Sequence, residues 1–372
     1  MKHFSVQSVS EGGKTYLYIL DHDALEMVLL PTQYLTYKIR ANLSPNTVRR
    51  SAVALCFYLE YMAENQLEPE QVFALTYAEQ NEHFIRFLHW LKSGQHKELN
   101  QGKIPRNGTC NAYLKEVFRF YLFLEAEHPG MGHLNVFTYN QYSTPNAVGV
   151  KRVIRSKSFR GYLKAEDRDV KPAKQEDIIT ILQACTNCRD QVLILMTAET
   201  GFRIGEILGV DYTRDIDYRE RTVRVYFRDD NENDARAKNA ECRRAKMSKD
   251  TFEILLHYMS VYRTFLQHQT YLFINIAGER AGEPMTAACV RDMFRRMEKK
   301  TGVKITPHML RRYFAVTRWE ADWALELISQ ALGHKHLDTT IKYLGVLDQK
   351  LMEASRRFYE QHSDIYEIDQ LL

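Results

Sequence analysis

One stretch near the C-terminal end, residues 306–343, limits the fold and the chemistry of the chain more than any other. His308 and Arg311 stand three residues apart at the head of a helical pattern, so they share one helix face and can address one small anion together. His334 follows 23 residues after Arg311, and Tyr343 follows nine residues after His334. The spacing therefore brings these four side chains to structured junctions, where they can converge.

The segment between these residues has a four-residue periodicity, which predicts one amphipathic helix packed on a core. The apolar positions of this helix are Trp319, Trp323, Ala324, Leu327, Ile328 and Ala331. Gly333 has the place of a left-handed helix terminator, and Asp338 is the expected N-cap of a short helix that carries Tyr343. We therefore expect one rigid helix with a polar cluster at each end.

A length of 372 residues exceeds one comfortable core, which predicts two domains. The net charge of +4 permits a nucleic-acid partner without demanding one. Six scattered cysteines predict reduced thiols in a cytosolic protein, and the pair Cys185 and Cys188 has no second pair at zinc-finger spacing, so no metal site is expected. No apolar run approaches transmembrane length, so we expect no membrane partner.

The first 150 residues predict a short β appendage, residues 1–33, and a small all-helical domain, residues 34–150. The appendage holds one strand-like run, Thr15–Leu20. The helical patterns run from the N-cap Ser44 to Met62, from Asn81 to Lys92 and from Thr109 to Glu127.

Residues 151–173 are strongly basic and have little apolar periodicity, which predicts an interdomain linker beside a polyanion or simply a solvated linker. Candidate DNA contacts from this segment and from a later basic run are Lys151, Arg152, Arg155, Lys157, Arg160, Arg243 and Arg244.

The remaining chain predicts a second, mostly helical domain, residues 174–346, and a tail helix, residues 347–372. Alternation at Thr222–Arg228 and the basic segment Lys238–Lys246 indicate a small antiparallel sheet. The other predicted elements are helices at Gln175–Ala184, Asp190–Ala198, Phe202–Leu208, Lys249–Gln267 and Thr286–Thr301. The expected fold class is thus mainly α with two domains, the second containing a small antiparallel β-sheet.

Arg203 lies just after the Thr200-Gly201 turn, where a guanidinium beside a helix N-terminus makes an anion site. Glu206, one turn later, is placed either to hold Arg203 or to form an ordinary surface pair with it. Two Arg and two His around one tyrosine suit a phosphodiester whose charge grows in the transition state, with Tyr343 as the nucleophile.

These motifs resemble the tyrosine recombinases, also called the phage integrase family. The family's boxes are similar to residues 200–208, to His308-Met309-Leu310-Arg311-Arg312, and to Leu332-Gly333-His334 followed by Tyr343. Arg312 replaces a usual His, and His336 is an addition. Residues 34–130 also look like the family's core-binding domain. The family's catalytic lysine, in a β-hairpin turn, is matched by Lys238, with Lys246 as the competing position.

The resemblance implies a site-specific DNA recombinase that integrates or excises a mobile element without ATP, metal or other cofactor. Arg203, His308, Arg311 and His334 would grip the scissile phosphate while Tyr343 forms a 3′-phosphotyrosyl bond. Lys238 would protonate the leaving oxygen. The implied partners are double-stranded DNA at attachment or terminal sites, a homo-tetramer on paired sites, and accessory recombination proteins. The expected location is the bacterial cytoplasm, at the nucleoid.

Three alternatives remain open at this stage. A type IB topoisomerase uses the same Arg, His and Tyr chemistry on a single duplex. A catalytically silent DNA-binding regulator would keep the fold without the reaction, and a helical scaffold would hold these motifs by coincidence. The C-terminal tail either exchanges between subunits or folds back on its own core. Target sequence and directionality do not follow from residue identities.

Overall fold

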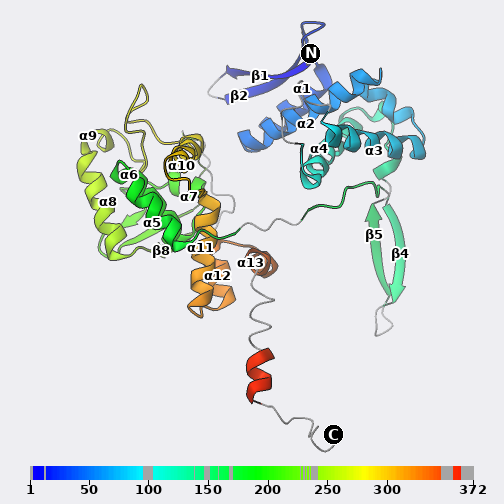
Figure 1. Cartoon of the computed structure of the whole chain (residues 1–372). Coiled ribbons are helices and arrows are strands. Elements are labelled where there is room, and N and C mark those ends of the chain that lie inside the picture. The colour runs from blue at the N-terminus through cyan, green and yellow to red at the C-terminus, as the bar shows by residue number, and fades with distance from the viewer. Residues whose placement is uncertain are drawn as a thin grey trace, which may run out of the picture. The chain divides into compact units, whose positions relative to one another are not determined.

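The computed structural model describes residues 3–11, 14–94, 104–137, 139–145, 151–157, 159–166, 171–226, 228, 231, 233, 235, 242–344 and 355–361. The chain divides into two units, Met1–Arg168 and Asp169–Leu372. Helices dominate both units, and the strands form small antiparallel sheets (Figure 1). The predicted fold class, mainly α with two domains, is confirmed. Among the described residues, no helix is long and apolar enough to cross a membrane.

The core of the first unit is built by four helices. They are α1 (Leu29–Arg40), α2 (Pro45–Glu64), α3 (Tyr77–Ser93) and α4 (Asn107–Glu127). The 3-10 helix Pro69–Ala74 lies between α2 and α3, and the 3-10 helices Pro129–Met131 and Asn135–Phe137 follow α4. The apolar spacing predicted α2, α3 and α4, and Ser44 caps α2 as expected. The sequence did not indicate α1, because its buried face contains Pro31 and Lys38, which interrupt the apolar pattern.

The N-terminal segment is a three-stranded antiparallel sheet that belongs to this core. Its strands are β1 (Phe4–Glu11), β2 (Lys14–Asp21) and β3 (Glu26–Met27), in the order β1-β2-β3. The predicted strand-like run is β2, but Leu17 and Ile19 are buried in the helical core. The short β appendage expected over residues 1–33 is thus a sheet packed on the helical core, and α1 already begins at Leu29.

The basic segment is also part of the first unit. Strand β4 (Tyr139–Pro145) pairs antiparallel with β5 (Lys151–Lys157), so the unit is not all-helical. After this hairpin, Phe159 is buried with its ring centroid 5.2 Å from that of Phe118. The Asn111 side chain bonds both the backbone N and O of Leu163, at 3.0 and 2.7 Å. The linker expected at residues 151–173 is thus a strand and a packed segment at least to residue 166. The sequence hid the strand because strand pairing uses backbone groups, which side-chain charge does not reveal.

The second unit packs its helices around α6 and one small sheet. Its elements are α5 (Gln175–Ala184), α6 (Cys188–Thr200), α7 (Ile204–Leu208), β6 (Ile216–Asp217), β7 (Thr222–Val225), β8 (Arg243–Lys246), α8 (Lys249–Val261), α9 (Arg263–Leu266), α10 (Ala287–Thr301), α11 (Pro307–Glu320), α12 (Leu325–Leu332) and α13 (Leu337–Leu344). The sheet order is β6-β7-β8, antiparallel, as the alternation predicted. Val192, Leu193, Ile194 and Met196 of α6 are buried in the centre of the core.

The long helix expected from Trp319 to Ala331 is in fact two helices. The chain leaves α11 at Ala321 and reaches α12 through Asp322, which has a positive φ of 58°. As a result Trp323 is 41% exposed and Leu327 is 54% exposed, whereas Ile328 and Leu332 are buried. The prediction of one continuous helix was wrong, because the four-residue spacing runs across a break between two helices. Figure 1 shows α11, α12 and α13 as three successive helices at one end of the unit.

Candidate active site

The short helix α7 carries Arg203 and Glu206. Arg203 is the N-cap residue, and its backbone N donates to Glu206 Oε2 at 2.8 Å. Its Nη1 donates to Glu206 Oε1 at 2.9 Å. The Glu206 side chain is fully buried, while the Arg203 side chain is 25% exposed. Glu206 therefore holds Arg203 in place, as one of the two sequence interpretations proposed, and the guanidinium keeps an open edge.

Helix α11 brings His308 and Arg311 to the same place. Thr306 caps this helix, and His308 is its second residue, with an exposed side chain. Arg311 is buried, and its Nη1 donates to the carbonyl of Gly201 at 2.7 Å, next to the turn that precedes Arg203. The two halves of the predicted site, separated by about a hundred residues of chain, are thus joined directly.

The C-terminal end of α12 collects three guanidinium groups on three successive carbonyls. Arg243 Nη1 donates to Ala331 O at 2.8 Å, Arg311 Nη2 to Leu332 O at 2.6 Å, and Arg203 Nη2 to Gly333 O at 3.3 Å. The last carbonyls of a helix have no partner within the helix, and they form the negative end of its dipole. This helix end therefore gathers the arginines of the site. Gly333 terminates α12 with a φ of 62°, as predicted.

His334 stands directly after this helix end and is held on both ring nitrogens. Its Nε2 lies 3.2 Å from Arg311 Nη2, and its Nδ1 lies 2.9 Å from Thr340 Oγ1. Since a guanidinium can only donate, Nε2 must carry the lone pair and Nδ1 the hydrogen that Thr340 accepts. Burial, followed by the charges of Arg311, Arg203 and Arg243, lowers the pKa of His334 to about 4. The imidazole is therefore neutral near pH 7. Nothing in the sequence pattern had indicated the role of Thr340.

The pKa of His308 is also lowered, first by burial and then by the charges of Arg311 and Arg312. A neutral imidazole can accept a proton, which suits the proton-acceptor role expected for His308. The carboxylate of Glu206 offsets only part of the charge of Arg203, Arg243 and Arg311. Burial alone would raise the pKa of Glu206, but the adjacent Arg243 and Arg203 lower it, so the carboxylate stays ionised. The site as a whole is cationic and fits an anion.

The nucleophile candidate lies on the next helix. Tyr343 belongs to α13, which starts at Leu337, four residues after Gly333. Only the backbone of Tyr343 is described. Asp338 lies inside α13 and does not precede it, so the expected N-cap was wrong by position. Thr340, fully buried, ties α13 to His334, and Leu344 packs in the small core of α11 and α12. The helix carrying Tyr343 is thus fixed to the cationic cluster.

Of the other predicted residues, Lys238 lies outside the described residues. Its competitor Lys246 is described at the end of β8, where its side chain is 61% exposed and 3.9 Å from Glu220. In the tail, residues 355–361 are helical, and the remainder of residues 347–372 is likewise outside the described part.

The candidate DNA contacts fall into three groups. Lys151, Arg152, Arg155 and Lys157 are on β5, where only the backbone is described. Arg160 and Arg244 are exposed. Arg243 is the exception, because its side chain is only 5% exposed and its Nη2 lies 2.5 Å from Glu206 Oε1. A contact of Arg243 with DNA stays a prediction, and the structure places this side chain inside the site, on Glu206.

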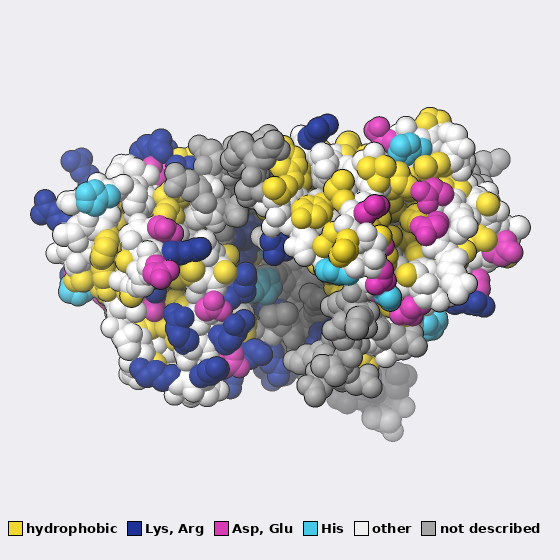
Figure 2. All heavy atoms as spheres, turned by 90° about the horizontal axis from the view of Figure 1, so that it is seen from above, with side chains coloured by type: hydrophobic (Ala, Val, Ile, Leu, Met, Phe, Trp, Pro, Cys, Tyr) yellow, Lys and Arg dark blue, Asp and Glu magenta, His cyan; other side chains and the backbone are white. Residues whose placement is uncertain are grey.

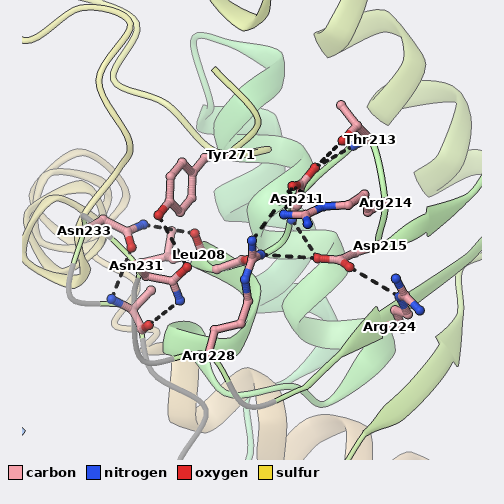
Figure 3. A network of polar contacts seen from close by, with 12 residues as sticks. Leu208, Asp211, Thr213, Arg214, Asp215, Arg224, Arg228, Asn231, Asn233 and Tyr271 are labelled. Atoms are coloured by element: carbon pink, nitrogen blue, oxygen red, sulfur yellow. Dashed lines mark hydrogen bonds and ion pairs between the residues drawn. The ribbon is translucent and has the colours of Figure 1, made fainter. Parts of the chain in front are cut away.

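The far end of α7 is anchored by a separate polar network, drawn in Figure 3. Arg228 Nη1 donates to Gly209 O at 2.9 Å and lies 3.6 Å from the buried Asp215. Asn233 Nδ2 donates to Leu208 O at 3.0 Å and to Met285 O at 3.0 Å. These bonds fix the C-terminal end of α7, the helix that presents Arg203 at its other end.

Figure 2 shows Lys and Arg side chains gathered on the second unit, at the left of the view.

Comparisons with known proteins agree with this geometry. Residues 170–350 match the model of the phage integrase family. Transposase A from transposon Tn554 of Staphylococcus aureus is 24% identical over 364 residues, which cover 96% of this chain and 98% of the transposase. Tyrosine recombinase XerC of Corynebacterium glutamicum is 28% identical over 212 residues, covering 52% of this chain and 64% of XerC.

Solved structures show the same fold. The Tn1549 transposon integrase in complex with transposon right end DNA has a TM-score of 0.56 at 16% identity, covering 88% of this chain and 99% of that one. XerH site-specific recombinase bound to its palindromic difH substrate has a TM-score of 0.57 at 17% identity, covering 83% of this chain and 79% of that one. A lambda integrase dimer bound to a core site has a TM-score of 0.56 at 13% identity, covering 85% of this chain and 94% of that one.

Proposed function

We propose that the chain is a tyrosine recombinase of a mobile element, whose residues cut and rejoin the ends of that element. The match of residues 170–350 to the phage integrase family model supports this proposal. The observation that carries the proposal is the gathering of Arg203, Arg311 and His334 at the end of α12. Helix α13, which bears Tyr343, begins immediately beyond this point.

In the proposed reaction the scissile phosphodiester lies against Arg203 and Arg311. The Tyr343 hydroxyl oxygen attacks phosphorus and gives up its proton to His308 or to water. The bond from phosphorus to the 5′ oxygen breaks, and Lys238 gives that oxygen a proton. The products are a 3′-phosphotyrosyl protein and a free 5′-hydroxyl. Attack of a 5′-hydroxyl from a second strand then reverses these steps and frees Tyr343.

The guanidinium groups of Arg203 and Arg311 would stabilise the transition state because the protein already holds them in place. Negative charge grows on the phosphate oxygens in the transition state, and donors fixed beforehand stabilise it without reorganising. Arg203 and Arg311 are fixed by Glu206 and by the carbonyls of Gly201, Leu332 and Gly333. The phosphodiester bond energy is conserved in the tyrosyl ester, so the steps consume no nucleotide.

The substrate we propose is duplex DNA at the two ends of a transposon-like element, joined by a homo-tetramer on paired sites. The alignment with the Tn554 transposase supports a mobile element, because it extends over both units of this chain. We place this reaction on chromosomal DNA in the bacterial cytoplasm. Accessory recombination proteins are additional candidate partners.

Covalent trapping tests the proposal. The protein is mixed with nicked duplexes from the boundaries of its own genetic locus, in EDTA, and resolved on a denaturing gel. We expect protein attached to a 3′ end, and no adduct from Tyr343→Phe at equal DNA occupancy. Joined products from two differently labelled duplexes are expected as well. An adduct that persists in Tyr343→Phe would refute the assignment, and relaxation of one plasmid without joining would indicate a topoisomerase.

A further inference from the structure

Arg243 is a buried cation in the candidate site, and groups of the protein itself hold it there. Its side chain is 5% exposed, its Nη2 lies 2.5 Å from Glu206 Oε1, and its Nη1 donates to Ala331 O at 2.8 Å. The guanidinium carbon also lies 5.2 Å from the centroid of the Phe202 ring. A buried guanidinium requires such partners, because an isolated charge away from water is costly. Arg243 therefore connects β8, α7 and the end of α12.

Glu206 is shared between two arginines. Its Oε1 lies 2.9 Å from Arg203 Nη1 and 2.5 Å from Arg243 Nη2. The position of this carboxylate thus depends on both cations. If the Arg243 charge were removed, Glu206 could shift toward Arg203, and the exposed edge of Arg203 would move with it. This coupling passes through one oxygen atom and requires no contact between Arg243 and DNA.

Gly333 rests directly on Arg243. A Cβ atom at residue 333 would lie 2.7 Å from Arg243 Cζ and 2.8 Å from Nη1, closer than side-chain atoms approach one another. Only a glycine leaves room for the guanidinium under this corner, in addition to the positive φ that also favours glycine. His334 is the next residue, so Arg243 supports the backbone from which that imidazole extends.

We propose that Arg243 is a positioning residue of the recombinase: through Glu206 it orients Arg203, and through Ala331 and Gly333 it fixes the corner that carries His334. The proposal rests on the proposed function, because it assigns Arg243 a part in that reaction. It also separates Arg243 from its neighbour Arg244, which is exposed on the same strand. Two adjacent arginines thus have different tasks, set by the alternation of side chains along β8.

The test compares Arg243→Met with Arg244→Met in the full-length protein. For each variant, the affinity for a locus-boundary duplex is measured at several salt concentrations, and the rate of adduct formation is measured at saturating DNA. For Arg243→Met we expect a rate loss on the order of 100-fold, as for a misplaced catalytic group, with an unchanged salt slope. For Arg244→Met we expect weaker binding and a salt slope smaller by about one unit.

A conservative variant keeps the test valid if Arg243→Met unfolds. Arg243→Lys retains the charge beside Glu206 but cannot also reach Ala331 O, so we expect an intermediate rate, between those of the wild type and Arg243→Met. Glu206→Gln combined with Arg243→Lys should lose less than the product of the two single losses, since both act on Arg203.

The outcomes that would overturn this inference differ from those that would overturn the function. If the wild-type protein forms no adduct, the proposed function fails. If the wild type cuts DNA and the Arg243 variants cut as fast at saturation, the positioning role is wrong. A reduced salt slope for Arg243→Met, matching that of Arg244→Met, would restore Arg243 as a DNA contact.

Discussion

At the scale of single residues, the site depends on charged groups whose protonation is set by their neighbours. His334 is the clearest case, because it lies among arginines and its ring is held between Arg311 and Thr340. Positive neighbours and burial both disfavour the imidazolium ion. A neutral His334 leaves the guanidiniums as the permanent cations of the site.

This arrangement predicts a pH dependence of stability. The pKa of His334 is about 4 in the folded protein and about 6.5 when unfolded, so the unfolded chain binds more protons between these values. The stabilisation is therefore complete above pH 6.5 and is lost as the pH falls toward 4. We expect the unfolding free energy of the wild type to fall more between pH 7.5 and 5 than that of His334→Gln, measured by denaturant titration. Equal falls in both proteins would show an ordinary pKa for His334.

The sequence could not predict which side chains of the site are buried. The types and spacing of Arg203, His308, Arg311 and His334 were sufficient to predict that these residues gather, whereas Tyr343 as the nucleophile stays a prediction, since only its backbone is described. Arg243 and Arg244 are identical in the sequence, and only the carbonyl of Ala331 and the carboxylate of Glu206 distinguish them. Thr340 was missed for the same reason, since its hydroxyl gains a role only when α13 approaches His334.

At the scale of elements, helix ends position the site. Three helices of the second unit stop at a glycine with positive φ: α6 at Gly201, α10 at Gly302 and α12 at Gly333. The carbonyl of Gly201 accepts a hydrogen bond from Arg311. The surroundings of these glycines differ. The effect of backbone conformation on stability can therefore be measured separately from the effect of side-chain packing.

Gly201→Ala and Gly302→Ala form a matched pair. A Cβ at residue 302 meets nothing within 4 Å, so we expect only the left-handed backbone penalty, about 1 kcal/mol. A Cβ at residue 201 would lie 2.5 Å from the ring of Phe314, which adds an overpacking cost of about 1–3 kcal/mol. Denaturant unfolding of the second unit should rank Gly201→Ala as the more damaging change, with a slower adduct rate as well. Similar losses for both variants would show that Phe314 moves aside freely.

Elements with strong local signals were predictable, and those defined by tertiary contacts were not. Helix α5 was expected at its observed bounds because its apolar spacing and acidic first turn agree. The break at Asp322 between α11 and α12 was missed because Trp319, Trp323 and Leu327 continue the helical spacing across it, although Trp323 and Leu327 are exposed. Strand β5 was missed because its composition is that of a linker.

At the scale of the whole molecule, each unit has its own core. Phe87 is buried in the core of the first unit and Leu193 in that of the second, both with no exposed surface. Hydrophobic burial stabilises each core separately, at about 25 cal/mol per Å² of apolar surface. The cores therefore provide separate points at which to perturb the protein.

Phe87→Ala and Leu193→Ala are expected to act on different thermal transitions. Each substitution leaves a cavity that costs about 2–5 kcal/mol, enough to lower the midpoint of its own unit by roughly 10 °C. Calorimetry of the wild type should show two transitions, of which each variant shifts one, and the double variant should show both shifts. A single transition that moves in both variants would mean that the units unfold together.

In the proposed reaction, the hydrogen bond from Arg203 to the carbonyl of Gly333 also limits when, during its synthesis, the protein becomes able to cut DNA. The two residues are 130 positions apart, so a ribosome that has just added Arg203 still needs on the order of ten seconds to add Gly333. Throughout that time the nascent chain has Arg203 without its acceptor and lacks Tyr343, the candidate nucleophile. If Tyr343 is the nucleophile, as proposed, DNA cleavage therefore cannot begin before the chain has been synthesised past this residue.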